Sequence, residues 1–156
     1  MAHTILIPTD FTPASLALVR SALNSAHEPL HILLVHGIAI GESITGMLFF
    51  SKANVLMKLM NAEFRHAIED LQTVYGRQLA SVKVELFLGD TQQSFSDFLE
   101  AQEVAQIFMP GTFRFARAHR LSKDLVPFLE RSLREKIKIS WSVKRFDAIG
   151  FSGANG

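Results

Sequence analysis

Near its start the sequence reads TILIPTDFTP, residues 4–13. The apolar run Ile5–Ile7 is followed at once by Pro8, a short polar turn and the pair Thr12-Pro13. Threonine followed by proline is typical of a helix beginning, because threonine caps free amide groups and proline fits the first turn. The stretch therefore predicts a strand, a turn and a helix that reaches about Ala26. A strand that leads directly into a helix is the basic unit of an α/β fold.

The same alternation of strand and helix continues along the chain. We expect further strands at residues 30–36, 82–88, 106–109 and 136–143, and helices at residues 52–75, 90–103 and 122–135. Asp90 and Gln93 resemble a capping box at the start of the third helix. Pro127 is tolerated only in the first turn of a helix, so the last helix should properly begin near Val126. This order predicts a mostly parallel sheet with helices on both faces.

The pattern of apolar and polar residues in the five strands predicts their order in the sheet. Residues 5–7, 32–35 and 107–109 are continuous apolar runs, which are typical of strands covered on both faces. The third and fifth strands alternate apolar and polar residues, as edge strands do. The predicted order is therefore 3-2-1-4-5. The chain reverses direction between strands one and four, where open α/β sheets bind ligands in a crevice. That crevice is lined by residues 8–12 and 110–112.

The bulk composition limits the classes of function. The chain has 156 residues, a net charge of +1 and no cysteine, which excludes disulfides, thiolate catalysis and any field that would attract nucleic acid. No apolar stretch approaches the roughly 18 residues that cross a bilayer, and we find no signal peptide pattern. We expect a cytoplasmic protein with one domain at residues 1–143 and a flexible tail at residues 144–156, without membrane or nucleic-acid partners.

Several segments resemble the universal stress protein family. Ile5–Thr12 is similar to the family's first strand and its aspartate-containing turn, and Val84–Asp90 to its third strand, which ends in Gly-Asp. Val104–Thr112 is similar to its fourth strand, and Ser122–Val143 to its last helix and strand. The resemblance covers about residues 3–143. It implies a universal-stress-protein-like fold, of the adenine nucleotide alpha hydrolase type.

Many members of the family bind ATP, and the resemblance implies where a nucleotide would lie. The implied cofactor-binding residues are Pro8, Thr9, Asp10, Val35, Pro110, Gly111, Thr112, Arg114 and Ser122. The family's glycine signature is broken, because the next glycine after Gly111 is Gly150. Glycines let backbone amides approach phosphate oxygens, and Pro110 has no amide donor. We therefore expect no cofactor, or only weak binding of ATP or AMP.

Two features near this site each admit more than one interpretation. Asp10 is either a turn or cap residue for the first helix or a contact to adenine or ribose. Arg114, Arg117, Arg120 and Lys123 recur every three residues. They are either a solvated loop over buried aromatic rings or phosphate partners that replace the missing glycines. The aromatic residues between them also leave a minor hypothesis of single-stranded nucleic-acid binding.

Catalysis and metal binding find little support in the sequence. No nucleophile motif, phosphate-binding loop or dinucleotide fingerprint is present, and Ser122 has no evident base partner. The six histidines show no metal-ligand spacing. We therefore expect no catalytic residues and no metal site.

Two apolar segments point instead to partners. The connection Gly37–Ser51 is long and rich in large apolar residues, so we expect it to fold over the crevice or a partner, or to pack on the domain's own core. In the fifth strand, Ile137, Ile139, Trp141 and Val143 share one face, and few charges protect the edge. We expect a homodimer through this strand. The expected function is partner binding in a stress response, the alternative a nucleotide-binding regulatory module with a rebuilt phosphate site.

Overall fold

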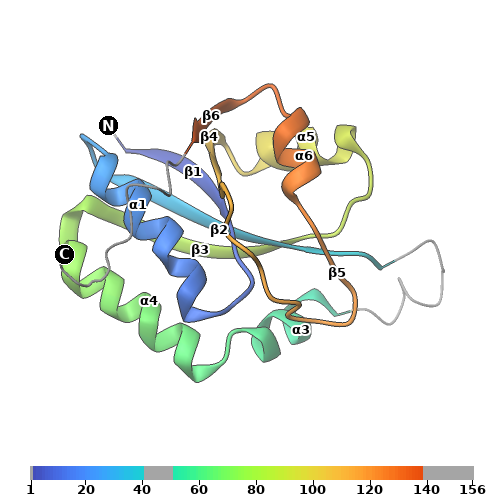
Figure 1. Cartoon of the computed structure of the whole chain (residues 1–156), viewed down its shortest axis with the longest axis horizontal. Coiled ribbons are helices and arrows are strands. Elements are labelled where there is room, and N and C mark those ends of the chain that lie inside the picture. Colours follow the sequence, from blue (N-terminus) through green and yellow to red (C-terminus); the bar gives the residue numbers. More distant parts are fainter. Residues whose placement is uncertain (1, 41–50, 139–156) are drawn as a thin grey trace.

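The computed structural model describes residues 2–40 and 51–138. Figure 1 shows a central twisted sheet with helices on both sides. The strands of the main path are β1 (His3–Pro8), β2 (Leu30–Ile38), β3 (Leu79–Phe87), β4 (Val104–Met109) and β6 (Glu135–Lys138). They run in the order β3-β2-β1-β4-β6, and every pair along this path is parallel. The predicted fold class and strand order are confirmed, with β6 as the fifth strand of the prediction.

Two helical layers enclose the sheet. On one face lie α1 (Ala17–Ser25), α3 (Lys52–Leu59) and α4 (Ala62–Tyr75), and on the other lie α5 (Gln92–Ala101) and α6 (Val126–Arg131) (Figure 1). Short 3-10 helices, η1 (Pro13–Leu16) and η2 (Gly76–Gln78), precede α1 and follow α4. The central strand β1 serves both layers, because Ile5 and Ile7 pack into the first core while Leu6 packs into the second.

Three helix predictions are corrected by the structure. Residues 52–75 form two helices, because Asn61 begins a new helix by accepting a hydrogen bond from the Phe64 amide at 3.0 Å. The capping box of α5 is made by Thr91 and Ser94, so the prediction that Asp90 and Gln93 form it was wrong.

The third correction concerns residues 122–135. The helix there is confined to Val126–Arg131, and Ser122–Lys123 instead forms the two-residue strand β5. This strand pairs antiparallel with the end of β2, Ser122 opposite Ile38 and Lys123 opposite Gly37. It adds a sixth strand off the main path of the sheet. The expected beginning of the helix near Val126 is confirmed.

Two of the predicted interaction segments fall largely outside the described residues. β2 extends through Gly37 to Ile38, and Ser51 caps α3, so the apolar connection is shorter than expected at both ends, and its residues 41–50 are not described. Ile139, Trp141 and Val143, and the predicted tail, are also outside them. None of the helices in the described part of the chain is both long and apolar enough to span a membrane.

Candidate functional site

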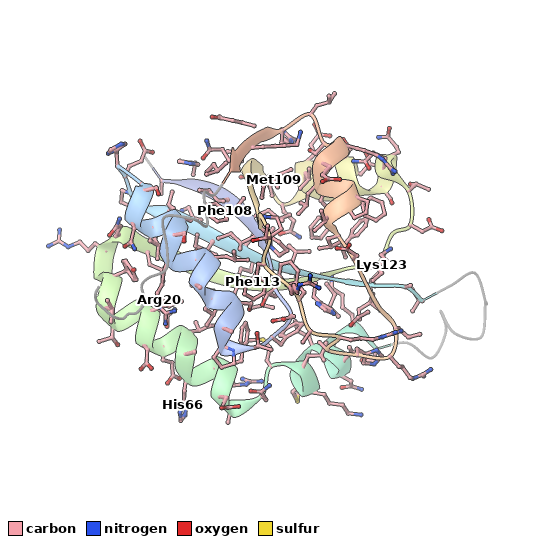
Figure 2. The ribbon with its side chains drawn as sticks, viewed as in Figure 1. Arg20, His66, Phe108, Met109, Phe113 and Lys123 are labelled. Atoms are coloured by element: carbon pink, nitrogen blue, oxygen red, sulfur yellow. The ribbon has the colours of Figure 1, made fainter. Side chains whose placement is uncertain are left out.

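A cleft of about 430 Å³ lies beyond the carboxyl ends of β1 and β2. Its walls come from the ends of these two strands, from the segment after β4 and from the stretch that contains β5. Figure 2 labels Phe113 and Lys123, which belong to these last two segments. The lining residues are Pro8, Thr9, Val35, His36, Gly37, residues 113–117 and residues 122–126. The cleft therefore lies where the strand order predicts a ligand crevice.

Asp10 lies beside this cleft but is not among the residues that line it. Its side chain is buried, and its Oδ1 accepts hydrogen bonds from the Thr12 amide at 3.0 Å and the Thr12 hydroxyl at 2.5 Å. Its Oδ2 accepts from the Ala116 amide at 2.6 Å. Both carboxyl oxygens are therefore used within the protein, one to form the turn before η1 and one to fix the segment after β4.

His36 and Ser122 form a polar pair in the wall of the cleft. The Nε2 of His36 lies 2.6 Å from the Ser122 hydroxyl oxygen, and its Nδ1 lies 2.7 Å from the Thr9 carbonyl oxygen. The Ser122 oxygen also accepts a hydrogen bond from the His119 amide at 2.9 Å. The pair joins the ends of β1, β2 and β5 at one point. The expectation that Ser122 lacks a base partner was wrong.

Burial controls the protonation of His36. Desolvation lowers the pKa of this imidazole below its ordinary value of 6.5, and the nearby His119 lowers it further. The hydrogen bond to Thr9 and the charge of Asp10 raise the pKa but do not offset the burial. His36 is therefore neutral at neutral pH, with one nitrogen available as an acceptor.

Gly37 explains why β5 can approach β2 so closely. A Cβ atom at this position would lie 2.9 Å from both the Lys123 carbonyl oxygen and the Leu125 Cδ2. Such contacts are shorter than van der Waals distance, so only glycine fits here without movement of β5. A glycine inside a strand often marks a close backbone approach, and this was the sequence signal for β5.

Three cations line the cleft in different states. Arg114 is exposed, and in residues 2–40 and 51–138 we find no ion-pair partner for it. The Arg117 guanidinium donates to the carbonyl oxygens of His119 at 3.4 Å and Arg120 at 2.6 Å. The four basic residues 114, 117, 120 and 123 share no helix, because residues 110–121 form turns and irregular backbone.

Lys123 is held by residues outside the lining of the cleft. Its Nζ donates to the Gly89 carbonyl and lies 5.0 Å and 5.4 Å from the ring centroids of Phe87 and Phe128. Burial lowers the pKa of this amine, and the charge of Asp90 partly opposes that effect. Lys123 is therefore engaged by the protein, and Arg114 is the cation of the cleft with most freedom to meet a ligand.

The structure gathers five of the nine residues implied by the family resemblance. Pro8, Thr9, Val35, Arg114 and Ser122 line the cleft, whereas Asp10, Pro110, Gly111 and Thr112 are not part of its lining. Pro110 and Gly111 belong to a turn in which the Phe113 amide donates to the Pro110 carbonyl at 3.2 Å. Sequence reasoning missed His36. In the described part of the chain, no group of three or more metal-binding side chains comes together.

The fold of this chain is similar to that of several solved structures, although its sequence matches little. No protein-family model matches the sequence, and no curated protein matches it. Among solved structures, a hypothetical protein named PH0823 aligns with a TM-score of 0.54 at 17% identity, covering 88% of this chain and 94% of that one. A member of the universal stress protein family from Burkholderia pseudomallei aligns with a TM-score of 0.50 at 15% identity, covering 87% and 94%. The chain has a universal-stress-protein-like fold. A universal stress protein solved in complex with cAMP aligns with a TM-score of 0.49 at 18% identity, covering 88% and 97%.

The segment after β4 packs two aromatic side chains on the domain. Phe113 and Phe115 meet edge to face with their ring centroids 4.9 Å apart, and both are partly buried against the core. These rings favour the interpretation of the segment as a solvated loop over buried aromatics. The Ala116 amide is directed to Asp10.

Proposed function

We propose that this protein acts in a stress response by binding partners as a homodimer, and that its binding of ATP is weak or absent. The observation that carries the proposal is the state of Asp10. Its two carboxyl oxygens accept hydrogen bonds from Thr12 and from the Ala116 amide. A ligand that needed this carboxylate would have to break bonds to a charged group, each worth roughly 1.5–3 kcal/mol.

The phosphate side of the crevice supports the same conclusion. Pro110 has no amide hydrogen, the Phe113 amide donates to Pro110, and the Ala116 amide donates to Asp10. Phosphate groups in such folds are held mainly by free backbone amides of a glycine-rich loop. The amides of Phe113 and Ala116 are therefore engaged within the protein, and Pro110 offers none, so we expect Mg-ATP to gain little binding energy here.

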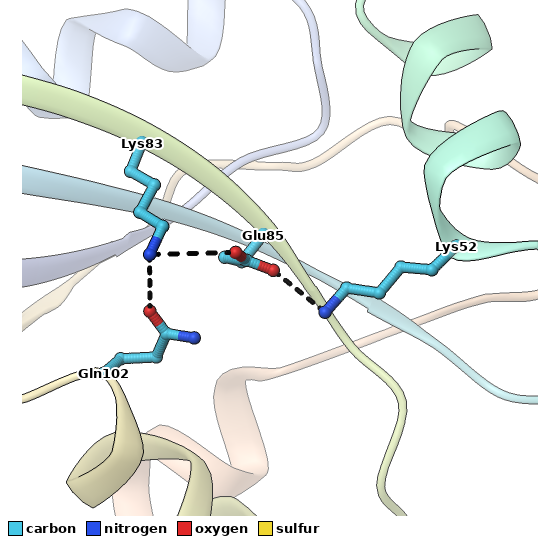
Figure 3. Close-up of polar contacts among 4 residues, drawn as sticks. All are labelled: Lys52, Lys83, Glu85 and Gln102. Carbon is cyan, nitrogen blue, oxygen red and sulfur yellow. Dashed lines mark hydrogen bonds and ion pairs between the residues drawn. The ribbon is translucent and has the colours of Figure 1, made fainter.

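The proposed dimer rests on a difference between the two edges of the sheet. At the β3 edge, Glu85 is paired with Lys52 of α3 at 2.9 Å and with Lys83 at 4.0 Å (Figure 3). Charged side chains on an edge strand discourage pairing with another chain. At the other edge lies β6, which carries Glu135, Lys136 and Lys138 but continues in sequence into the apolar series that contains Trp141. We propose that this edge pairs with a second copy about a two-fold axis.

Native mass spectrometry of the purified, undenatured protein tests both parts of the proposal at once. We expect a dimer mass without bound nucleotide, and a shift towards monomer for Trp141→Glu, with circular dichroism showing that the fold is retained. Tryptophan is a frequent interface hot spot. A monomer at about 100 μM, far above dissociation constants typical of stable interfaces, would contradict the dimer.

A second candidate function is a nucleotide-binding regulatory module with a rebuilt phosphate site. The observation that favours it is Arg114, an exposed guanidinium on the cleft wall, since arginine binds phosphate through two parallel hydrogen bonds. ATP or AMP that co-purifies with the protein would support this function. In that case Arg114→Ala should weaken ATP binding more than adenosine binding, while Arg77→Ala, on η2 and outside the cleft lining, should change neither.

A further inference from the structure

The pair formed by Ser122 and His36 has the arrangement of an activated hydroxyl group. Nucleophilic serines lie within about 2.6–3.2 Å of a base whose other side is oriented by a third group. Here the serine oxygen lies 2.6 Å from Nε2 of His36, and the Thr9 carbonyl oxygen lies 2.7 Å from Nδ1. All three residues line the cleft.

The positions of the protons follow from the partners. A carbonyl oxygen can only accept, so Nδ1 of His36 carries the hydrogen that Thr9 receives. In the neutral ring Nε2 is then an acceptor, and it receives the hydrogen of the Ser122 hydroxyl. The His119 amide donates a hydrogen bond to the Ser122 oxygen, so that oxygen accepts from His119 while its own hydrogen goes to His36. The serine proton therefore points at the base, the direction in which it would leave.

The surroundings of the pair suit a base and an anionic reactant. His36 is only 6% exposed, and burial keeps it neutral at neutral pH by lowering its pKa. Arg114 and Arg117 line the same cleft, and cations near a reacting carbonyl stabilise the negative charge that develops on its oxygen. The cleft volume of about 430 Å³ admits a small molecule.

A second histidine–serine pair lacks these features and serves as an internal comparison. His31 Nδ1 lies 2.7 Å from the Ser81 hydroxyl oxygen, on the exposed surface of β2 and β3. Neither residue lines the cleft described above. A similar hydrogen bond without the cleft, the buried base and the nearby arginines gives no reason for reactivity.

We propose that Ser122 is a nucleophile that takes the acyl group of a small, negatively charged acyl donor, with His36 as its general base. The Ser122 oxygen attacks the acyl carbon, and its proton moves to His36 Nε2. The bond between that carbon and the leaving oxygen then breaks, and the leaving oxygen takes the proton from Nε2. The products are an ester on Ser122 and the released alcohol or acid. This modification is independent of the partner binding proposed above.

The test uses two esters that differ in charge, mono-4-nitrophenyl succinate and the neutral 4-nitrophenyl acetate. We expect release of one equivalent of 4-nitrophenolate per chain and, by peptide mass spectrometry, a succinyl group on Ser122. His36→Gln should slow acylation about 100-fold or more, the usual contribution of a general base. Arg114→Gln should reduce the preference for the succinate ester, and Ser81→Ala should change nothing.

The pH dependence separates nucleophilic reactivity from a purely structural hydrogen bond. The acylation rate should rise with pH as His36 loses its proton and then level off, and His36→Gln should remove this profile. Peptide mass spectrometry of the acylated wild-type protein identifies the modified residue even if a variant fails to fold. Three results would overturn the proposal. The first is a folded protein that is not acylated on Ser122, and the second is equal acylation of Ser81 or of Lys123. The third is an unchanged rate of Ser122 acylation in a folded His36→Gln variant.

Discussion

Asp10 and His36 lie at the carboxyl ends of neighbouring strands and are nearly equally buried, at 3% and 6% exposure. The difference between them is in their partners. Both carboxyl oxygens of Asp10 accept hydrogen bonds from the protein itself, from Thr12 and from the Ala116 amide. His36 is held on one side by Thr9 and meets the cleft through Ser122 on the other. The comparison teaches that the role of a buried polar residue depends on its partners: Asp10 is bonded to groups that fix the turn and the segment after β4, whereas His36 accepts from a hydroxyl group that itself lines the cleft.

The largest expected effect comes from removing the carboxyl group of Asp10. Asp10→Ala would leave the amides of Thr12 and Ala116 without their acceptor, so we expect a loss of about 2–4 kcal/mol in the free energy of unfolding, measured by urea denaturation. Asp70→Ala, on the exposed side of α4, is the control and should change stability by less than about 0.5 kcal/mol. Equal stability of the two variants would remove the distinction between a structural and a ligand-binding Asp10.

Gly37→Ala tests the other side of the comparison, because it disturbs the approach of β5 to β2. The added Cβ would meet the Lys123 carbonyl oxygen at 2.9 Å, and backbone atoms cannot yield by a rotamer change. We expect a loss of about 1–3 kcal/mol, the usual cost of overpacking, together with a changed NMR environment of the His36 ring as Ser122 moves. An unchanged ring signal in a destabilised variant would show that β5 does not position Ser122.

Among these three tests, the smallest expected effect is a dependence of stability on pH. Because the pKa of His36 is lowered in the folded state, the unfolded chain takes up a proton first as the pH falls through about 6.5. The contribution of neutral His36 to stability is therefore full above that pH. It is lost on acidification towards the folded pKa, with a slope of at most about 1.4 kcal/mol per pH unit. His36→Gln should flatten this slope, whereas His66→Gln should not, because His66 is an exposed residue of α4 (Figure 2). A slope that is the same in both variants would contradict the burial of a neutral His36.

The arrangement of the sheet and its helical layers could be predicted from the sequence, because strands covered on both faces and half-exposed strands differ in their pattern of apolar and polar residues. Continuous apolar runs lie in β1, β2 and β4, and alternating residues lie in β3 and in the sequence from Ile137 to Val143 that begins within β6, so the strand order could be predicted. Helix ends were less predictable. The spacing of apolar residues predicts one helix over residues 52–75, but the N-cap Asn61 begins a second helix within it.

The candidate site was predicted only in part. The strand order located its position and the resemblance gave five of its fifteen lining residues, but hydrogen bonds between distant segments decided which residues face the cleft. The bond from the Ala116 amide to Asp10 joins residues 106 positions apart, and that between His36 and Ser122 joins residues 86 positions apart. Ser122 falls at the beginning of the predicted helix at residues 122–135, whereas in the structure it lies in β5, opposite Ile38. The glycine at position 37 was the local signal for the close approach, and we read it as the start of a loop.

Titration calorimetry of the wild-type protein with Mg-ATP tests the central claim most directly. The account predicts no binding tighter than about 100 μM, a standard free energy of roughly −5.5 kcal/mol, because Asp10 is engaged, Pro110 has no amide hydrogen and the Phe113 and Ala116 amides are used within the protein. A dissociation constant in the low micromolar range would contradict it, and loss of that binding in a folded Asp10→Ala variant would identify Asp10 as a ligand contact after all.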